Sequence, residues 1–198
     1  RPGTSNDNSD TIDYVTIAST GNATDFGNDV EKRANNAGAC SSTRGLIAGG
    51  NLNTQPGGES TNVISYITIA STGNGTDFGD LTAAKTDPGG AGSSTRAVFA
   101  GGNTNPGSAP YGSNVATIDF VTIASTGNAS DFGDTQVAGT TRGVSNATKA
   151  VYAQSQGTPA GALTTITIAS TGNSTTFGDL SVARTKAGTG SSAHGGIQ

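Results

Sequence analysis

One seven-residue segment occurs four times in this chain, and it constrains the fold more than any other feature of the sequence. The segment reads Thr-Ile-Ala-Ser-Thr-Gly-Asn, and its copies begin at Thr16, Thr68, Thr122 and Thr167. Successive copies are therefore 52, 54 and 45 residues apart. Four identical heptapeptides do not arise by chance, and periods of this length are typical of propellers, solenoids and arrays. The sequence therefore predicts a protein built from four copies of one structural unit.

Other residues recur at fixed places around this segment. An apolar stretch precedes each copy, and a Phe-Gly pair follows it. In the first two units a second apolar run comes after the Phe-Gly pair and ends in two glycines, Gly49-Gly50 and Gly101-Gly102. The apolar stretches are Ile12–Ile17, Ile64–Ile69, Ile118–Ile123 and Leu163–Ile168, and the aromatic residues are Phe26, Phe78, Phe132 and Phe177. We expect the phenylalanines and the double glycines to be structural positions of the repeat.

This pattern predicts four short strands per unit in a single all-β domain that spans residues 1–198. The units cover residues 2–51, 52–103, 104–156 and 157–198. Thr-Gly-Asn is expected to form a hairpin turn, because Gly and Asn tolerate positive φ. In Ile12–Ile17 both alternating sets contain apolar residues, which is typical of a strand covered on both faces. No segment combines sustained helical periodicity with caps, so we expect little helix.

Composition limits the classes of partner. Only 32% of the residues are apolar and the net charge is −4, but the apolar residues gather in short β-branched runs. Such clustering favours thin sheets with many turns over disorder. We expect no nucleic-acid partner, which needs a basic surface, and no membrane insertion, which needs about 18 consecutive apolar residues. The chain starts at Arg1 without a signal-peptide pattern, so we expect a processed product or a fragment.

The unit resembles the kelch repeat. That pattern has an apolar run ending in two glycines, a variable loop, a strand with an aromatic residue and a strand with a large aromatic residue. Here these features are Val98–Gly102, Tyr111–Thr117, Phe120 and Phe132, although Phe stands where kelch repeats usually have Trp. The third unit also has Gln154-Ser155 in place of the double glycine. The resemblance implies a kelch-like β-propeller with units of about 45–54 residues.

Kelch order assigns the strands of one blade. Residues 37–41 would form the innermost strand, Leu46–Gly50 the second, Ile64–Ile69 the third and Thr76–Leu81 the outer one. The chain then starts just before a third strand and stops inside a second. We therefore expect the structure to be closed either by its own N- and C-terminal half-blades or by a neighbouring subunit, which would protect the sheet edges.

The segment from Ile12 to Gly27 is also similar to repeats in virion structural and tail-fibre-like proteins of bacteriophages from aquatic environments, including those that infect cyanobacteria. This resemblance implies an extracellular, virion-associated structural protein, of the kind that builds a filament or serves host attachment. It also implies that the partners are further copies of the chain or other virion and fibre proteins.

The loops between the second and third strands vary most among the units. Variable loops on one face of a constant scaffold are candidates for a binding surface. The simpler interpretation is that they are tolerated surface loops. The positions that mark this possible surface are Asn51, Asn103, Tyr111 and Gln156.

Residues with catalytic potential have a structural interpretation in this chain. Asp25, Asp77 and Asp131 recur at one position, and a residue that repeats in each unit serves the repeat more often than a single active site, so we expect these carboxylates to fix turns rather than bind metal. Cys40 is expected to be a buried structural thiol, and His194 replaces a surface cation. We therefore predict no catalytic residue, no metal site and no cofactor.

Cations and sequons also recur once per unit. Arg44, Arg96 and Lys149 occupy equivalent positions, where we expect them to hold carboxylates of adjacent blades rather than to form a ring that binds an anionic glycan. Four copies of Asn-x-Thr/Ser would be glycosylation sites in a host that makes N-glycans, and would otherwise be turn sequences. These asparagines are Asn22, Asn74, Asn128 and Asn173.

Together these features favour a non-enzymatic structural protein of an extracellular assembly, of the phage virion or tail-fibre type, over two alternatives. The second hypothesis is a lectin- or adhesin-like propeller module that binds a cell-surface glycan or receptor. The third is a polysaccharide-degrading enzyme, which the single histidine and two glutamates of the chain disfavour.

Overall fold

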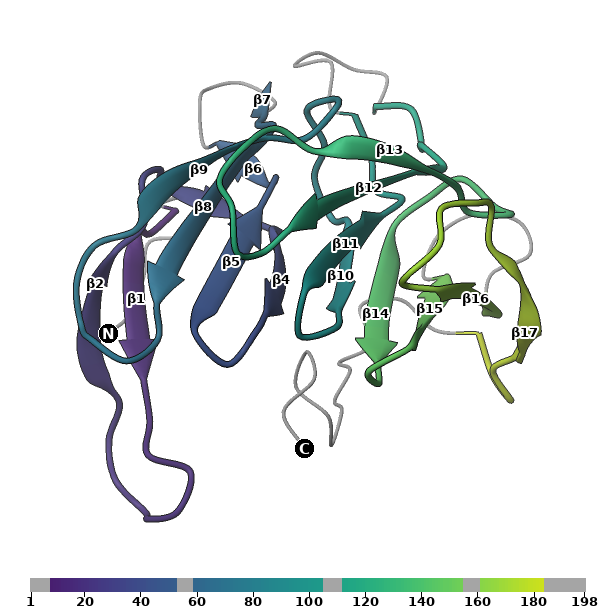
Figure 1. Ribbon diagram of the computed structural model, residues 1–198. Coiled ribbons are helices and arrows are strands. Elements are labelled where there is room, and N and C mark those ends of the chain that lie inside the picture. The colour runs from purple at the N-terminus through teal and green to yellow at the C-terminus, as the bar shows by residue number, and fades with distance from the viewer. Residues whose placement is uncertain (1–7, 53–58, 105–111, 155–160, 184–198) are drawn as a thin grey trace.

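The computed structural model describes residues 8–52, 59–104, 112–154 and 161–183. In these ranges the chain forms antiparallel strands and no helix (Figure 1), so the all-β prediction is confirmed. Tyr111, Gln156 and His194, which the sequence singled out, lie outside the described residues.

Three sheets contain four antiparallel strands each, arranged side by side in chain order. The first sheet consists of β4 (Ala37–Cys40), β5 (Arg44–Ala48), β8 (Val63–Thr68) and β9 (Thr76–Asp80). The second consists of β10 (Gly89–Gly92), β11 (Arg96–Ala100), β12 (Thr117–Thr122) and β13 (Ser130–Asp134). The third consists of β14 (Thr141–Ser145), β15 (Lys149–Gln154), β16 (Ala162–Thr167) and β17 (Thr175–Asp179). The strand order expected for residues 37–81 is therefore the one observed.

The N-terminal part of the chain forms a shorter sheet. It contains only β1 (Thr11–Tyr14) and β2 (Thr24–Asn28), which correspond in sequence to the last two strands of each larger sheet. A further small sheet joins β3 (Arg33–Ala34), β6 (Asn51–Leu52) and β7 (Glu59–Ser60). The predicted C-terminal end of the strand Ile12–Ile17 is wrong, because β1 stops at Tyr14. Among the described strands β1 pairs only with β2, so its last residues lack the second neighbour that its counterparts have.

Each Phe-Gly pair forms a β-bulge in the last strand of its sheet. Between β8 and β9, Ile64 pairs with Gly79 and Ser65 pairs with Asp77, which leaves Phe78 as the extra residue. The same register shift occurs in the other three sheets. A bulge re-aims a side chain and bends its strand, and here it turns Phe78 and Phe132 into the core. The repeated Phe-Gly pair is therefore a bulge sequence.

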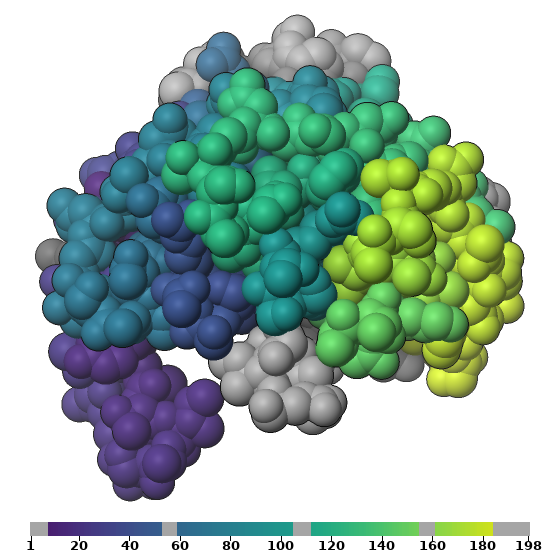
Figure 2. Space-filling view, in the orientation of Figure 1, coloured from purple at the N-terminus to yellow at the C-terminus, as the bar shows by residue number. Residues whose placement is uncertain are grey.

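Neighbouring sheets lie against one another in an arc (Figure 1), with β1–β2 at one end and β14–β17 at the other. Their first strands are adjacent, β4 beside β10 and β10 beside β14. This approach needs glycine, because a Cβ on Gly90 would collide with the carbonyl of Gly38, and one on Gly143 would collide with the carbonyl of Gly90. In Figures 1 and 2 the two end sheets lie apart, and the described residues do not close a ring.

The core consists of layers between neighbouring sheets. One layer joins the first and second four-stranded sheets through residues such as Leu46, Phe78 and Phe99, and another joins the second and third through Val98 and Tyr152. Val98 and Phe99 are consecutive in β11, and both are fully buried. This strand of the middle sheet is therefore covered on both faces. Each layer consists only of the side chains that two facing sheets contribute, so a modest apolar content is enough to form it.

Candidate functional site

The Thr-Gly-Asn segment lies in the hairpin loop of its own sheet, and it also binds the last strand of the preceding sheet. The amide of Gly73 donates a 2.8 Å hydrogen bond to the carbonyl of Phe26, and the amide of Gly75 donates a 2.7 Å bond to the carbonyl of Asn28. The loop thus pairs with β2 across the junction between two sheets. The turn of each hairpin is formed instead from the heptapeptide's first threonine to its serine, and the Ser71 amide donates to the Thr68 carbonyl at 3.3 Å. The prediction that Thr-Gly-Asn forms the turn is therefore wrong, and the sequence did not predict its contact with the preceding sheet.

The same pair of bonds recurs at each of the following junctions. Gly127 and Ala129 donate to the carbonyls of Phe78 and Asp80 at 2.7 Å and 2.7 Å. At the last junction the amides of Gly172 and Ser174 donate to the carbonyls of Phe132 and Asp134, at 2.7 Å and 2.8 Å. Repetition with the same register shows that the loop and the bulged strand are two halves of one contact, which we call the loop–edge contact.

The asparagine of each sequon completes the loop–edge contact. The Oδ1 atom of Asn74 accepts a 3.0 Å hydrogen bond from the amide of Asn28. Asn128 and Asn173 accept equivalent bonds from the amides of Asp80 and Asp134, at 3.1 Å and 2.9 Å. All three asparagines, and Asn22, are exposed. Each of the three therefore has a structural function as an acceptor, and glycosylation of the four sequons stays a prediction.

The glycine after each phenylalanine gives the loop room to approach. Gly27, Gly79 and Gly133 have φ angles of 148°, 143° and 141°, a backbone conformation that residues with a Cβ rarely adopt. A Cβ at these positions would also overlap the carbonyl of Gly73, Gly127 or Gly172 in the docked loop. The repeat therefore needs glycine here for two reasons, backbone conformation and close contact between chain segments.

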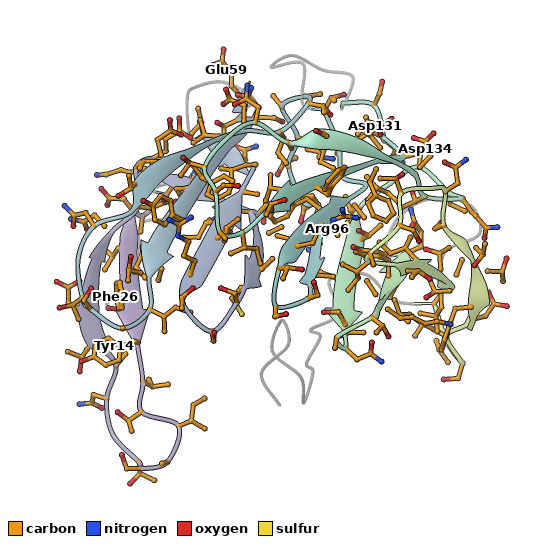
Figure 3. The ribbon with its side chains drawn as sticks, in the orientation of Figure 1. Tyr14, Phe26, Glu59, Arg96, Asp131 and Asp134 are labelled. Atoms are coloured by element: carbon orange, nitrogen blue, oxygen red, sulfur yellow. The ribbon has the colours of Figure 1, made fainter. Side chains whose placement is uncertain are left out.

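An aromatic pair packs behind each of the three loop–edge contacts. Tyr14 meets Phe26 edge to face with ring centroids 6.0 Å apart (Figure 3), and the Tyr66–Phe78 and Phe120–Phe132 pairs repeat this geometry. The three phenylalanines are at most 9% exposed, whereas Phe177 in β17 is 59% exposed. The four equivalent residues thus differ in burial, and only the one at the C-terminal end of the described chain is uncovered.

The recurrent arginines bind carbonyl groups rather than carboxylates. The guanidinium carbon of Arg96 lies 4.4 Å from the centroid of the Phe120 ring, and its Nη1 donates a 2.8 Å bond to the carbonyl of Ile168 in the next sheet. Arg44 has the same arrangement with Tyr66 and the carbonyl of Ile123. The prediction that these cations hold carboxylates of adjacent blades is therefore wrong for the arginines. A stacked guanidinium reaches the carbonyl that ends the neighbouring apolar strand.

Buried cations make a second kind of link between sheets. Arg33 is buried, and its guanidinium donates hydrogen bonds to the side chains of Asp29 and Ser65. It also donates to three backbone carbonyls, one in β5, one in β8 and one at Gly49. Lys85 occupies the same place one sheet later, with Nζ 2.6 Å from the buried Asp119 carboxylate and 3.1 Å from the Thr117 carbonyl. Burial lowers the pKa of Lys85, and the charge of Asp119 opposes that shift.

The double glycines hold the links between sheets. The φ angles of Gly49 and Gly50 are 63° and 119°, and those of Gly101 and Gly102 are 63° and 110°. The amide of Gly50 donates to the Lys85 carbonyl at 2.9 Å. A Cβ on Gly49 would lie 2.6 Å from that carbonyl. These glycines therefore let the chain pass close to the link that carries the buried cation.

The loop residues that were candidates for a binding surface take part in local structure. Asn51 belongs to β6 and pairs with Ala34 and Ser60. Asn103 forms bridges with Thr86 and Asn114, and its side-chain amide donates to the Gly112 carbonyl at 2.9 Å. Both asparagines thus organise their own loops, and a binding function of this surface stays a prediction.

Aspartate and cysteine have structural functions. Asp25 and Asp131 each accept a 3.1 Å hydrogen bond from the amide two residues later. That amide belongs to the β-bulge of β2 or β13, so these carboxylates hold a bulge and not the hairpin turn that the sequence predicted. Cys40 is only half-buried rather than buried, and burial raises the pKa of its thiol. Within the described ranges, no three His, Cys, Asp or Glu side chains gather as metal ligands would, and no helix is long and apolar enough to span a membrane.

Two hollows lie under successive Thr-Gly-Asn loops. One has a volume of about 240 Å³ and is lined by Phe120, Ser125, Thr126, Asn128 and neighbouring residues. The other has a volume of about 210 Å³ and is lined by Phe132, Ser170, Thr171, Asn173 and neighbouring residues. Each hollow presents hydroxyl and amide groups beside an aromatic ring, which is a lining suited to a small polar ligand such as a sugar.

These features define an all-β repeat protein whose sheets are joined by one recurring loop–edge contact. No protein-family model matches the chain, and no curated protein is similar to it. The resemblances to kelch repeats and to phage fibre repeats therefore stay predictions.

Proposed function

We propose that this chain is a non-enzymatic structural protein of an extracellular assembly, of the phage virion or tail-fibre type. The observation that carries the proposal is the use made of the repeated residues. Gly127, Asn128 and Phe132, which recur in all four units, serve contacts between sheets or the packing behind them. Because the repeated residues join neighbouring sheets, the chain would act as a rigid scaffold. Its loops would remain available for contacts with partners.

The proposed architecture is a propeller-like arrangement in which each four-stranded sheet is one blade. The order of the strands in each sheet and the adjacency of β4, β10 and β14 support it. In this arrangement the two-stranded sheet of β1 and β2 is the outer half of a further blade, and its inner half comes from a neighbouring subunit. Such completion would protect the open edge of β1 from unspecific pairing.

Immunolabelling tests the assignment to an extracellular assembly. Antibodies raised against the recombinant chain should decorate intact extracellular particles from the source community in electron micrographs. Preimmune serum provides the control for adsorption to particles. Labelling confined to the interior of intact cells would contradict the proposal, as would sustained turnover of host polysaccharide by the purified chain.

A second candidate is a glycan-binding module, and the two hollows under the loops favour it. Their linings share the serine, threonine, glycine and asparagine of the loop but take the aromatic ring from different repeat positions, Phe120 in one hollow and Phe132 in the other. Two weak sugar sites of this kind would act together through avidity. A glycan array with the wild-type chain tests this candidate, with Thr171→Val and Ser170→Ala as variants of the hollow lined by Phe132. Binding that these variants abolish would favour the glycan-binding module over a purely structural chain.

A further inference from the structure

The loop–edge contact has two halves, and each end of the described chain carries one half that is unused. The N-terminal hairpin has the donor half, with the loop residues Gly21, Asn22 and Ala23. The C-terminal strand β17 has the acceptor half, with Phe177 and Asp179 at the positions that accept the loop elsewhere. Both halves keep the residues that make the contact at the three occupied junctions.

The acceptor half on β17 is uncovered among the described residues. Phe177 is 59% exposed, whereas Phe26, Phe78 and Phe132 are 9%, 2% and 3% exposed. Gly178 has a φ angle of 157°, close to that of the other bulge glycines, but nothing lies within 4 Å of the place where its Cβ would be. The bulge and its glycine are thus present without the loop that requires them.

The donor half is equally free. Residues 15–23 are all exposed, and Figure 2 shows this hairpin projecting from the body of the molecule. The exposure of the isoleucine in the heptapeptide depends on the size of the preceding sheet. Ile17, which no described sheet precedes, is 91% exposed, and Ile69, which the two-stranded sheet precedes, is 44% exposed. Ile123 and Ile168, which four-stranded sheets precede, are both 1% exposed. Ile17 is therefore an apolar side chain that lacks the sheet against which its counterparts pack.

We propose that the first loop of one copy of this chain docks on β17 of a second copy, through a fourth loop–edge contact. The amides of Gly21 and Ala23 would donate to the carbonyls of Phe177 and Asp179, and Asn22 would accept from the amide of Asp179. Docking covers Phe177 and brings Ile17 against the last sheet. This inference rests on the proposed structural function and names the partner, a second copy, and the surface that it uses.

The partner is a second copy because the two halves lie far apart in one molecule. Figures 1 and 2 place the β1–β2 hairpin and β17 at opposite ends of the arc. The contact is continuous with an interface that already repeats three times within the chain, so the geometry for docking exists. Because the two halves are different surfaces, the contact is head to tail, and such contacts build rings when the rotation closes and filaments when it does not.

Disulfide trapping tests the proposal directly. In a Cys40→Ser background, chains carrying Asn22→Cys are mixed with chains carrying Asp179→Cys and oxidised gently. The positive control for geometry is Asp80→Cys with Asn128→Cys in one chain, where the Asn128 side chain bonds the Asp80 amide at 3.1 Å. We expect the mixture to form a covalent heterodimer at least tenfold faster than a mixture in which Thr24→Cys replaces Asn22→Cys.

The chain carrying both Asn22→Cys and Asp179→Cys decides between two chains and one. Disulfide-linked multimers support the proposal, whereas an internal disulfide in a monomer overturns it, because the chain then closes on itself. The proposal is also overturned if neither the mixture nor the double-cysteine chain forms a disulfide while the control pair, Asp80→Cys with Asn128→Cys, does. Failure here leaves the immunolabelling result unaffected, so the two proposals fail separately.

Association without cross-links provides the second measurement. Sedimentation of the wild-type chain should show concentration-dependent growth, and Gly178→Val should weaken it at least tenfold, because a side chain there blocks the loop. The far-UV circular dichroism of Gly178→Val should stay close to that of the wild type, and its Tm should fall only by the cost of a side chain at this φ angle of 157°, since no described residue of the same copy lies within 4 Å of the Cβ position. Equal association of the wild type and Gly178→Val would overturn the proposal.

Discussion

The amide of Gly127 donates a 2.7 Å hydrogen bond to the carbonyl of Phe78, in the last strand of the preceding sheet. The bond joins a loop residue to a bulge residue across a sheet boundary, which gives both recurring positions a structural function. The loop must expose its amide, and the bulge must turn its carbonyl outward and its ring inward. The repeat is therefore a device for joining sheets as well as for forming them.

The glycine beside that carbonyl is the most sensitive position of the contact. We expect Gly133→Ala to lower the free energy of unfolding by about 3 kcal/mol, because a Cβ is strained at its φ of 141° and overlaps the docked loop. Urea denaturation measures the loss. Gly178→Ala is the matched control, since its backbone is alike but no loop covers it. A loss of equal size in both variants would show that backbone strain alone matters.

The stacked arginine should contribute through packing and through its hydrogen bond. Arg96→Ala is expected to cost about 1–2 kcal/mol, because it removes the contact with the Phe120 ring and leaves the Ile168 carbonyl without its donor. Thermal denaturation followed by circular dichroism checks this. Lys149→Ala, at the equivalent exposed position, should change Tm by much less. The interpretation is wrong if both substitutions have the same effect.

The buried Lys85–Asp119 pair should tolerate joint replacement better than the loss of one partner. Asp119→Thr alone should cost about 3–5 kcal/mol, because it leaves a buried ammonium without its counter-charge. Thr is the residue that the third four-stranded sheet has at this place, Thr164. Adding Lys85→Met should recover most of the loss. A double-mutant cycle in urea measures the coupling, and additive losses would contradict it.

The hydroxyl of Tyr152 is buried and has no hydrogen-bond partner in the described part of the chain. Burying a hydroxyl without a hydrogen-bond partner costs desolvation free energy, and phenylalanine does not carry this cost. We therefore expect Tyr152→Phe to raise the free energy of unfolding by about 1 kcal/mol at pH 7. Urea denaturation of the two proteins measures the difference, and clear destabilisation would show that the hydroxyl has a partner.

The same residue predicts a difference at alkaline pH. Burial raises the pKa of Tyr152 above its ordinary value of 10.0, so the unfolded chain releases this proton first. The stability contributed by the neutral phenol is fully present below pH 10.0 and declines above it, by up to about 1.4 kcal/mol per pH unit. Tyr152→Phe should therefore lose stability less steeply than the wild type above that pH. Parallel profiles would show that Tyr152 does not titrate on unfolding.

The strand pattern could be read from the sequence because it rests on local chemistry. Apolar stretches and small-residue runs place β5, β8 and β9 to within about two residues, whereas the order within a sheet was predicted from the resemblance to kelch repeats. The error at Ile12–Ile17 arose because strand length depends on a neighbour. The residues after Tyr14 have the same composition as their counterparts but no second strand beside them.

The partners of repeated polar residues could not be predicted in the same way. Arg96 was expected beside a carboxylate, yet it binds the carbonyl of Ile168, 72 positions later. Backbone carbonyls are present at each residue, so a sequence does not indicate which of them a cation will reach. The open space beside Gly178 was equally hidden, because it shows only when its surroundings are compared with those of Gly133.

The sequence by itself determined the period and the approximate positions of the strands and hairpin loops, since hydrophobic runs and glycine act over a few residues. Only the tertiary structure decided that the last three Thr-Gly-Asn segments each bind the preceding sheet. The physical reason is that a loop has the same sequence whether its outward amides bind water or another strand. Which of these occurs depends on where the whole sheets come to lie.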